Sequence, residues 1–359
     1  MKKVLIIQDR ILHYRKPFYN ELSKYYDVTV LHPGVKTVTS EDLYREIITK
    51  AFKLGPFYIQ SKVFSTIKKG NYDIIVMIHD LRWLMNFLAK MRYARAFPFV
   101  WWGMDFSKSP AVNYVKRLSV KGKTPIVYYC EKLKNDFAEQ GVNRRKLFFA
   151  NNTFAISEQD REKCFLNQGK NIILFVGSMD KRKQSEVLLQ AFANIIKDIP
   201  ENIKLYFVGE GEQKSSLEKL VEQLKLEQRV VFKGKIIDNK TLKFYYKEAL
   251  FSVSFGQAGL SVLQSLGYGV PFVTKKNAVT GGELFNIVDG ENGILCEDDI
   301  ISLQKTMKKL CNDKPLCLEL GKRAYDYYDQ YCTMENMVSG FIRAFDYAED
   351  AFKGKSFLK

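Results

Sequence analysis

The sequence has 359 residues, of which 46% are hydrophobic and 14% are aromatic, and its formal net charge at pH 7 is +16. This length exceeds what one hydrophobic core usually supports, so two domains are expected, and the composition excludes a disordered chain. The sequence contains no run of about 18 uncharged apolar residues, which excludes a membrane-spanning helix.

The positive charge is concentrated in the first part of the chain. Residues 1–150 hold 27 Lys and Arg against 12 Asp and Glu, a net charge of +15, whereas residues 151–359 hold 29 against 28. Such a field favours an anionic partner, which could be lipid headgroups, a phosphorylated substrate or nucleic acid. A lysine-rich, merely solvated surface is the alternative, but it would be expected in both parts.

The N-terminus and the cysteines predict a cytoplasmic protein. The apolar run Val4–Ile7 is too short for a signal peptide and is typical of a first strand. The six cysteines form no Cys-x-x-Cys pair, so we expect reduced thiols rather than a metal site or a disulfide framework.

Short apolar runs alternate with helix-like segments along residues 1–150. We expect strands at 4–7, 27–31, 73–78, 99–102, 126–129 and 146–150, and helices at 17–25, 82–96, 111–119 and 131–140. This alternation predicts a doubly wound, Rossmann-like α/β domain.

A second alternating series begins at residue 171. We expect strands at 172–176, 204–208, 229–232, 250–254, 271–274 and 294–296, and helices at 185–197, 212–224, 241–248, 260–268 and 300–312. The predicted domains are 1–156 and 157–332, with the polar stretch 157–170 as the linker. A last helix within 333–359 is expected to pack back on the first domain.

Residues 252–274 predict an anion site. A buried strand leads through a small-residue turn into a short helix, whose free N–H groups and dipole suit a phosphate. Gln264 lies about 7.5 Å along the helix axis, at roughly 1.5 Å per residue, where its side chain could reach a sugar hydroxyl beyond the phosphate. An ordinary βαβ unit with glycine at its turn is the alternative.

Two cations, Arg182 and Lys183, follow the strand at 172–176 and stand beside a helix N-terminus. Cations are unfavourable there unless an anion shares the site, so a diphosphate would explain them. A solvated basic loop is the alternative. The glycines of Gly209-Glu-Gly211 and Gly234 fit a tight turn and a ligand contact equally well.

In this order and spacing, these segments resemble the family 4 glycosyltransferases of the GT-B fold, strongly over residues 170–300 and faintly before them. The matching motifs are Phe175-Val-Gly177 with Lys183, Phe207-Val-Gly-Glu-Gly211, Val231-Phe-Lys-Gly234, Gly259-Leu260 and Gly269-Val-Pro271. The resemblance implies two Rossmann-like domains facing across a cleft. It also implies transfer of a sugar from a nucleotide sugar with retention at the anomeric carbon, without a metal or another cofactor.

The resemblance also implies the site residues. Lys183 would bind the donor diphosphate with help from Arg182, and Asp105 is the candidate catalytic carboxylate. Further donor contacts are expected from Gly177, Ser178, Gly209, Gly234, Lys235, Ile236, Gln257, Ala258, Gly259, Leu260, Ser261 and Gln264. The acceptor side is expected to include His13 and Arg15. For a histidine such as His13 or His79, a structural role is the alternative.

The sequence departs from the family pattern at three places. Two glutamates eight positions apart are replaced by Gly256 and Gln264, and an arginine is replaced by Ser178. A Trp-Gly-His-Gly motif of some relatives reads Trp102-Gly-Met-Asp105 here. These losses keep open a non-catalytic GT-B subunit that binds sugar or scaffolds a partner. A GT-B nucleotide-sugar epimerase is a further alternative.

The segment 82–97 is basic and aromatic with helical spacing, so it could lie on an anionic membrane. A helix packed on the sheet with an exposed basic face is the alternative. Together with the charge of residues 1–150, this segment predicts peripheral attachment to the inner face of the cytoplasmic membrane. A glycan or lipid-linked acceptor, in surface polysaccharide synthesis, would then be natural. No nucleic-acid-binding signature is present.

Overall fold

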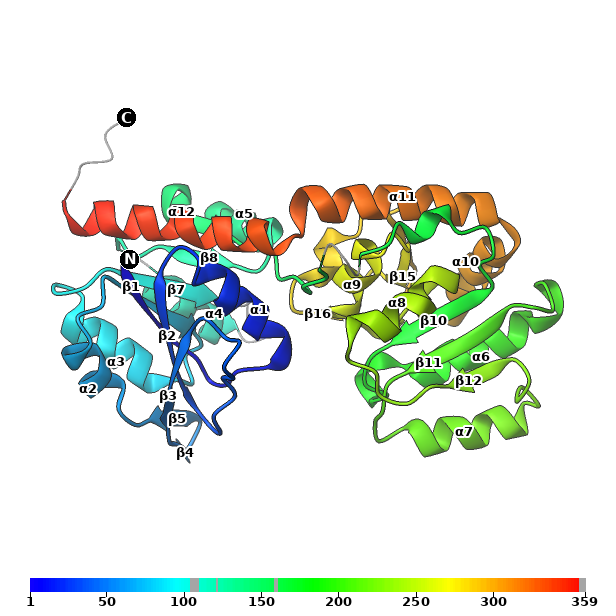
Figure 1. The fold of residues 1–359 in the computed structure, drawn as a ribbon, viewed down its shortest axis with the longest axis horizontal. Coiled ribbons are helices and arrows are strands. Elements are labelled where there is room, and N and C mark those ends of the chain that lie inside the picture. Colours follow the sequence, from blue (N-terminus) through cyan, green and yellow to red (C-terminus); the bar gives the residue numbers. More distant parts are fainter. Residues whose placement is uncertain (104–109, 121, 158–160, 355–359) are drawn as a thin grey trace. The chain divides into compact units, whose positions relative to one another are not determined.

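The computed structural model describes residues 1–103, 110–120, 122–157 and 161–354. By its internal contacts the chain divides into two units. The N-terminal unit comprises residues 1–152 together with the segment from residue 334 onwards, and the C-terminal unit comprises residues 153–333 (Figure 1). The boundary between the two units after residue 152 falls a few residues before the expected boundary after residue 156.

The N-terminal unit contains a seven-stranded parallel sheet in the order β3-β2-β1-β6-β7-β8-β9. Its strands are β1 (Lys3–Ile7), β2 (Asp27–Pro33), β3 (Arg45–Thr49), β6 (Ile74–His79), β7 (Phe99–Gly103), β8 (Ile126–Tyr128) and β9 (Leu147–Phe149). Because helices cover both faces of a parallel sheet, its strands are nearly continuous apolar runs, and every residue of β7 is buried.

Alternation along β7 shows how the two faces are covered. The helices are α1 (Lys16–Leu22), α2 (Val63–Lys69), α3 (Leu84–Tyr93), α4 (Pro110–Ser119), α5 (Glu131–Glu139) and α12 (Met334–Phe352). Trp101 belongs to the core beneath α2, α3 and α5. The ring of Trp102 lies on the opposite face, 5.2 Å from Phe18 of α1 and 4.8 Å from Phe341 of α12. The last helix is therefore part of the core of the N-terminal unit.

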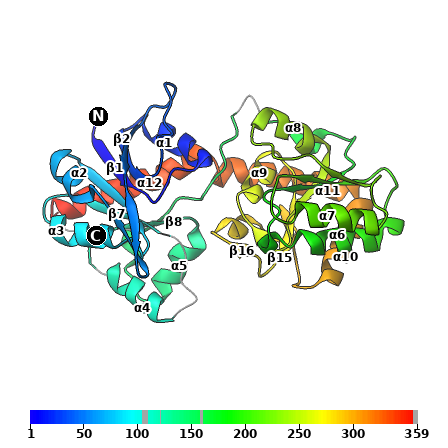
Figure 2. The same cartoon turned by 90° about the horizontal axis from the view of Figure 1, so that it is seen from below.

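The C-terminal unit contains a six-stranded parallel sheet in the order β12-β11-β10-β13-β15-β17. Its strands are β10 (Ile172–Val176), β11 (Lys204–Val208), β12 (Val230–Phe232), β13 (Ala249–Val253), β15 (Phe272–Lys275) and β17 (Gly293–Cys296). Its helices are α6 (Ser185–Ile195), α7 (Lys214–Gln223), α8 (Asn239–Glu248), α9 (Ser261–Gly267), α10 (Ile300–Asn312) and α11 (Lys314–Tyr331), as Figure 2 shows from below.

In both sheets the first strand of the unit is the point from which later strands are added on either side. In the C-terminal unit β10 lies between β11 and β13, and in the N-terminal unit β1 lies between β2 and β6. The prediction of two doubly wound α/β domains is therefore confirmed. In sheets of this kind ligands bind outside the carboxyl ends of the strands at the point of reversal.

The structure differs from the expectation in two segments. Between β2 and β6 it contains the unpredicted strand β3, the hairpin formed by β4 (Ala51–Leu54) and β5 (Phe57–Gln60), and helix α2. The stretch 157–170 is not a free linker, because the described part of it packs on the C-terminal unit. The Arg161 guanidinium donates to Gly267 O, and the buried Lys170 ammonium donates to Ala249 O at 2.7 Å. Long cationic side chains can bury their stems in this way, which polarity alone does not reveal.

Several titratable groups are buried as structural elements. Burial lowers the pKa of His79 to about 3, and its ring nitrogen lies 2.7 Å from Ser119 Oγ. All six cysteines are buried and none forms a disulfide with another, and burial raises the pKa of Cys164 and Cys296 to about 11. Within the described ranges, none of the helices has the length and hydrophobicity needed to cross a bilayer.

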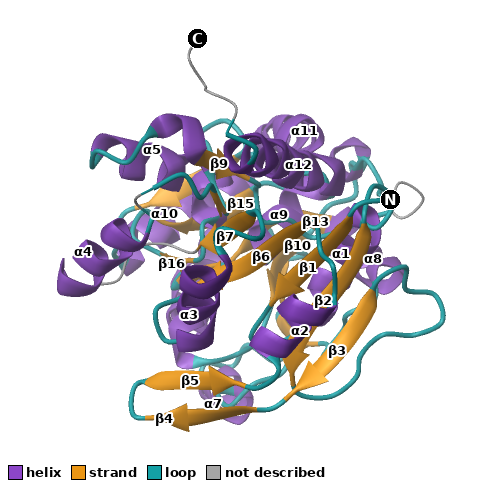
Figure 3. Cartoon of the chain, turned by 90° about the vertical axis from the view of Figure 1, so that its left-hand side faces the viewer, coloured by secondary structure: helices purple, strands orange, loops and turns teal. Residues whose placement is uncertain are grey.

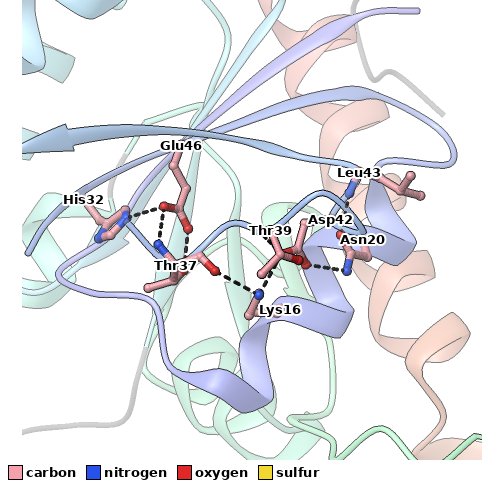
Figure 4. A network of polar contacts seen from close by, with 8 residues as sticks. All are labelled: Lys16, Asn20, His32, Thr37, Thr39, Asp42, Leu43 and Glu46. Carbon is pink, nitrogen blue, oxygen red and sulfur yellow. Dashed lines mark hydrogen bonds and ion pairs between the residues drawn. The ribbon is translucent and has the colours of Figure 1, made fainter. Parts of the chain in front are cut away.

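A polar network fixes the loop between β2 and β3 to helix α1 (Figure 4). Lys16 Nζ lies 2.7 Å from Asp42 Oδ2, and Asn20 Nδ2 donates to Asp42 Oδ1 at 3.0 Å. Burial opposes ionisation of Asp42, but hydrogen bonds from Lys16, Thr39 and Asn20 outweigh it and lower the pKa of this carboxyl to about 2. The ionised form of Asp42 is therefore stabilised by the fold.

We predict that Asp42→Asn lowers the free energy of unfolding at pH 7 by about 1–3 kcal/mol, because charge-assisted hydrogen bonds are lost. The folded pKa lies below the unfolded one, so the stabilisation is complete above about pH 5 and declines as the pH falls from roughly 4 towards 2. Urea unfolding of both proteins at several pH values measures this difference. If the difference in unfolding free energy between the two proteins does not shrink as the pH falls, the low pKa of Asp42 is wrong.

Candidate active site

Two loops meet at the carboxyl edge of the C-terminal sheet, where its strand order reverses. Gly177 follows β10 and leads into a 3-10 turn, Lys181–Lys183. The chain after β13 passes through the short strand β14 (Gln257–Ala258) before helix α9 begins. The topology therefore brings the predicted Lys183 and Gln257 segments to the place where doubly wound domains bind ligands.

Glycines follow the strands at this edge, and their backbones pack closely together. Gly177 N donates to Val208 O at 3.0 Å, and Gly209 N donates to Gly234 O at 2.7 Å. Gly209 has φ +152°, and a Cβ added there would stand 1.8 Å from Gly177 O. Only glycine fits at Gly209, and its absent side chain leaves the edge accessible to a ligand.

Lys183 is a nearly buried cation, 7% exposed, at the centre of this arrangement. Its Nζ lies 3.4 Å from Gln257 O, which is its single side-chain hydrogen-bond partner among the described residues. Added Cβ atoms at Gly177 and Gly259 would lie 3.7 Å and 3.6 Å from the same nitrogen. Burial holds the pKa of Lys183 below its usual range, although the charges of Asp180 and Glu283 oppose this shift. A desolvated ammonium with one weak acceptor favours an anion beside it.

The position of Lys183 depends on a backbone contact at Gly256. Gly256 N donates to Lys183 O at 3.0 Å. A Cβ at residue 256 would stand 2.2 Å from Arg182 O, so the loop after β13 could not approach the Lys183 turn this closely. The absence of a glutamate at residue 256 thus has a structural reason.

The Arg182 side chain points to a different partner. Its Nη2 lies 2.9 Å from Asp180 Oδ2, and the side chain is 65% exposed. Ser178 Oγ donates to the same carboxylate oxygen at 2.8 Å. The structure therefore groups Ser178 and Arg182 around Asp180, whereas Lys183 is the cation that lies against the turn at Gln257.

Gln264 lies on α9 and is 4% exposed. Its Oε1 accepts a hydrogen bond from the Tyr246 hydroxyl at 3.2 Å, while its Nε2 is buried and finds no partner among the described residues. The hydroxyl of Ser261, at the start of the same helix, is also buried and unpaired. A buried donor without an acceptor is costly, so a ligand oxygen that accepts from Gln264 would be favoured.

Glu283 is a carboxylate near this site that sequence reasoning missed. It follows strand β16 (Val279–Thr280), which pairs with β14, and it is 5% exposed. Its Oε2 accepts a hydrogen bond from Gly281 N at 2.9 Å, and its charge acts on Lys183. The glycine pair Gly281-Gly282 before Glu283 is typical of a turn. Only the pairing of β14 with β16 brings that turn to the site.

The remaining predicted donor residues lie along the same edge. Gly234 and Lys235 follow β12, and Ile236 packs against the core cluster that contains Tyr246. Ala258 is fully buried, and Leu260 directly precedes α9. The helix begins one residue later than expected.

On the N-terminal unit, the predicted acceptor residues follow β1. His13 and Arg15 form a 3-10 turn, in which His13 is exposed. The Arg15 guanidinium lies 5.0 Å from the ring centroids of both Trp102 and Tyr129. Asp105 lies outside the described residues.

Two further carboxylates occupy the point of strand reversal in this unit. Asp9 follows β1 and Asp80 follows β6, and their charges interact. Burial raises the pKa of Asp9, whereas Arg82 Nη2 lies 2.6 Å from Asp80 Oδ2 and helps to keep that carboxylate ionised. These residues were not predicted as site residues, since their proximity follows from the pairing of β1 with β6.

Comparison with known proteins shows what the chain is similar to. Residues 156–327 match the family model described as glycosyl transferases group 1. Solved structures cover the whole chain: HepE from Anabaena, in complex with UDP, is 16% identical with a TM-score of 0.73 and covers 96% of this chain and 100% of its own. A glycosyltransferase from Rickettsia africae is 14% identical with a TM-score of 0.75 and covers 99% of both chains.

These matches support a group 1 glycosyltransferase, and the chain has the GT-B fold.

Curated relatives of this glycosyltransferase act on different acceptors. The N-acetyl-alpha-D-glucosaminyl L-malate synthase of Bacillus anthracis is 28% identical over 200 residues, which are 55% of this chain and 51% of the relative. An alpha-1,4-N-acetyl-D-galactosaminyltransferase of Campylobacter jejuni, whose name specifies an undecaprenol-linked acceptor, is 24% identical over 85% of this chain and 86% of its own.

We predict that Gln264→Ala weakens UDP binding to the glycosyltransferase by about 2- to 10-fold, the effect of losing one neutral hydrogen bond. A ribose hydroxyl can accept a hydrogen bond from the Gln264 amide or donate one to a carboxylate. Gln264→Glu should therefore preserve or improve the affinity, because a charge-assisted hydrogen bond is stronger. Isothermal titration of the three proteins measures this. Equal dissociation constants in all three would mean that the side chain does not face the nucleotide.

Proposed function

We propose that this glycosyltransferase is a retaining, family 4 enzyme that transfers a sugar from a nucleoside-diphosphate sugar to a glycan or lipid-linked acceptor. The observation that carries the proposal is Lys183, a buried ammonium held at the point of strand reversal. Among the described residues it has no carboxylate within ion-pair distance. The UDP complex of HepE and the undecaprenol-linked acceptor named for the Campylobacter jejuni relative support the two substrate classes.

In the proposed reaction, the bond between the anomeric carbon and the β-phosphate oxygen breaks, and a bond from an acceptor oxygen to the same carbon forms. The nucleoside diphosphate leaves with the electron pair, and its phosphate oxygen takes the proton of the acceptor hydroxyl. Lys183 stabilises the negative charge that develops on the diphosphate, and its burial strengthens this interaction. The turn at Gly259 and the Gln264 amide orient the donor.

The donor site takes up the diphosphate without a metal in this proposal. Among the residues that the structure describes, no three His, Cys, Asp or Glu side chains lie close enough together to hold a metal ion. Lys183 supplies positive charge at the diphosphate instead.

We further propose that the enzyme works at the cytoplasmic face of an anionic membrane. The net charge of +15 on residues 1–150 supports this. On α3 the basic face is smaller than the sequence suggested. Arg92 is exposed, as is Arg95 just beyond the helix. Lys90 is partly buried with its Nζ 5.4 Å from the Trp101 ring, and burial lowers the pKa of this lysine.

We predict that Lys183→Ala weakens nucleoside-diphosphate binding at pH 7 by about 10- to 100-fold, corresponding to roughly 1.5–3 kcal/mol for a hydrogen bond to a charged group. Because burial holds the pKa of Lys183 below its usual range, the wild-type affinity should also fall on alkaline titration at a lower pH than an ordinary lysine would cause. This pH dependence should be absent from the variant. Isothermal titration with UDP, GDP and ADP provides the measurement.

Lys181→Ala is the matched control, because Lys181 lies in the same 3-10 turn but is exposed. It should bind like the wild type. If Lys183→Ala also binds like the wild type, or if no nucleoside diphosphate binds the wild type, the proposed donor site is wrong.

We predict that sugar transfer continues in the presence of EDTA, because the donor charge is met by Lys183 rather than by a metal ion. Turnover of a nucleotide sugar, followed by release of the nucleoside diphosphate, measures this. Activity that is abolished by EDTA and restored by Mg²⁺ or Mn²⁺ would overturn the metal-free mechanism while leaving the fold assignment intact.

A further inference from the structure

The hairpin β4–β5 of the N-terminal unit forms a two-stranded antiparallel sheet of its own. Figure 3 shows it apart from the seven-stranded sheet. The register pairs Phe52 with Ile59 and Leu54 with Phe57. Since side chains alternate between the two faces of a ribbon, these four apolar residues share one face.

The opposite face of the hairpin is anchored. Tyr58 stacks on Trp83 with ring centroids 5.2 Å apart, and Tyr58 N donates to Arg82 O at 2.6 Å. At the base, Ser61 N donates to Lys50 O at 2.8 Å, and Gln60 is buried. The hairpin is therefore held firmly by one face and by its base.

The apolar face is uncovered in the chain as described. Phe52 is 58% exposed, Leu54 is 63% exposed and Phe57 is 40% exposed. Single exposed apolar side chains are common, but a contiguous apolar face on an anchored ribbon marks a binding surface. The contacts described above that anchor the hairpin to the rest of the unit are made by its other face and its base.

The charge around the hairpin indicates what covers this face. Residues 47–72 contain five lysines and no Asp or Glu. Lys50, Lys53 and Lys62, which lie in or beside the hairpin, are exposed. Lys53 is paired with Tyr58 and so projects from the face opposite the apolar one. A second copy of the same surface would repel it, whereas an anionic bilayer offers apolar depth beneath negative headgroups.

The base of the hairpin adjoins the acceptor-side loops of its unit. Gln60 Nε2 donates to Thr49 Oγ1 at 3.2 Å and lies 3.5 Å from Gln8 O. Gln8 directly precedes Asp9 at the point of strand reversal. A bilayer that held the hairpin would therefore hold these loops at its surface, where the head of a lipid-linked acceptor lies.

We propose that the β4–β5 hairpin inserts its apolar face, Phe52, Leu54 and Phe57, among the headgroups of an anionic bilayer and so docks the N-terminal unit on the membrane. This rests on the proposed function at a membrane surface and names the part of the chain that makes the contact.

The test is sedimentation of the full chain with phosphatidylcholine vesicles, with and without phosphatidylglycerol. The wild type should bind the anionic vesicles. The affinity of the triple variant Phe52→Ser, Leu54→Ser, Phe57→Ser for these vesicles should be lower by a factor of about ten or more. The variant Lys50→Gln, Lys53→Gln, Lys62→Gln should lose affinity at low salt and show a weaker dependence on salt.

The matched control is the triple variant Leu166→Ser, Phe244→Ser, Ile301→Ser in the C-terminal unit. These three residues are 66%, 64% and 58% exposed, respectively. This control should bind vesicles like the wild type. UDP titration of every variant reports the donor site independently, so a failure of donor binding is distinguishable from a failure of docking. Because UDP binding reports only the C-terminal unit, the circular dichroism spectrum and thermal unfolding of the hairpin variant are compared with those of the wild type to show that its N-terminal unit folds.

Two results would overturn the proposal. One is vesicle binding by the hairpin variant that equals the wild type, or no binding by the wild type. The other is a concentration-dependent dimer in analytical ultracentrifugation that the same serine substitutions abolish, because a second copy would then be the occupant. Quenching of Phe57→Trp fluorescence by brominated lipid, beyond the quenching of the wild type, would place the hairpin at the acyl boundary.

Discussion

The close backbone approach of two loops organises the site of the C-terminal unit. Gly256 donates to the carbonyl of Lys183 at 3.0 Å, a distance that a side chain at residue 256 would prevent. This contact turns the Lys183 side chain inward, past Gly177 and against Gln257. A charge that would otherwise be solvated is thereby desolvated, and it forms no ion pair within the part of the chain that the structure describes. This burial costs free energy, and under the proposed function it is what makes the ammonium effective toward a diphosphate.

The chemistry is divided between the units in a way that their charges reflect. The C-terminal unit carries the proposed donor segment in a nearly neutral part of the sequence, and the proposal assigns the diphosphate to a single desolvated lysine there. The first 150 residues carry almost the whole positive charge, together with the acceptor-side turn and the anchored hairpin. Long-range attraction to a lipid surface needs many exposed cations. Stabilisation of a leaving group needs one buried cation at a fixed position.

Much of the fold could be predicted because parallel strands buried on both faces leave an unmistakable pattern. The apolar runs of β1, β7, β10 and β13 were located within a residue or two, and glycines marked the turns that follow β10 and β11. The edge strand β3 and the hairpin escaped because their residues are only partly apolar. The packing of residues 161–170 escaped because Arg161 and Lys170 are polar by type yet are held by backbone carbonyls.

The sequence by itself determined the α/β class, the two units, the family resemblance and Lys183 as the candidate donor cation. These depend on local periodicity and on spacing along the chain. Only the tertiary structure decided that Arg182 turns to Asp180, that Glu283 lies near Lys183, that Gln264 retains an unpaired donor, and that one face of the hairpin is bare. Each of these depends on which strands become neighbours and on which face a side chain is buried. Strand pairing joins residues far apart in the chain, and no local pattern encodes it.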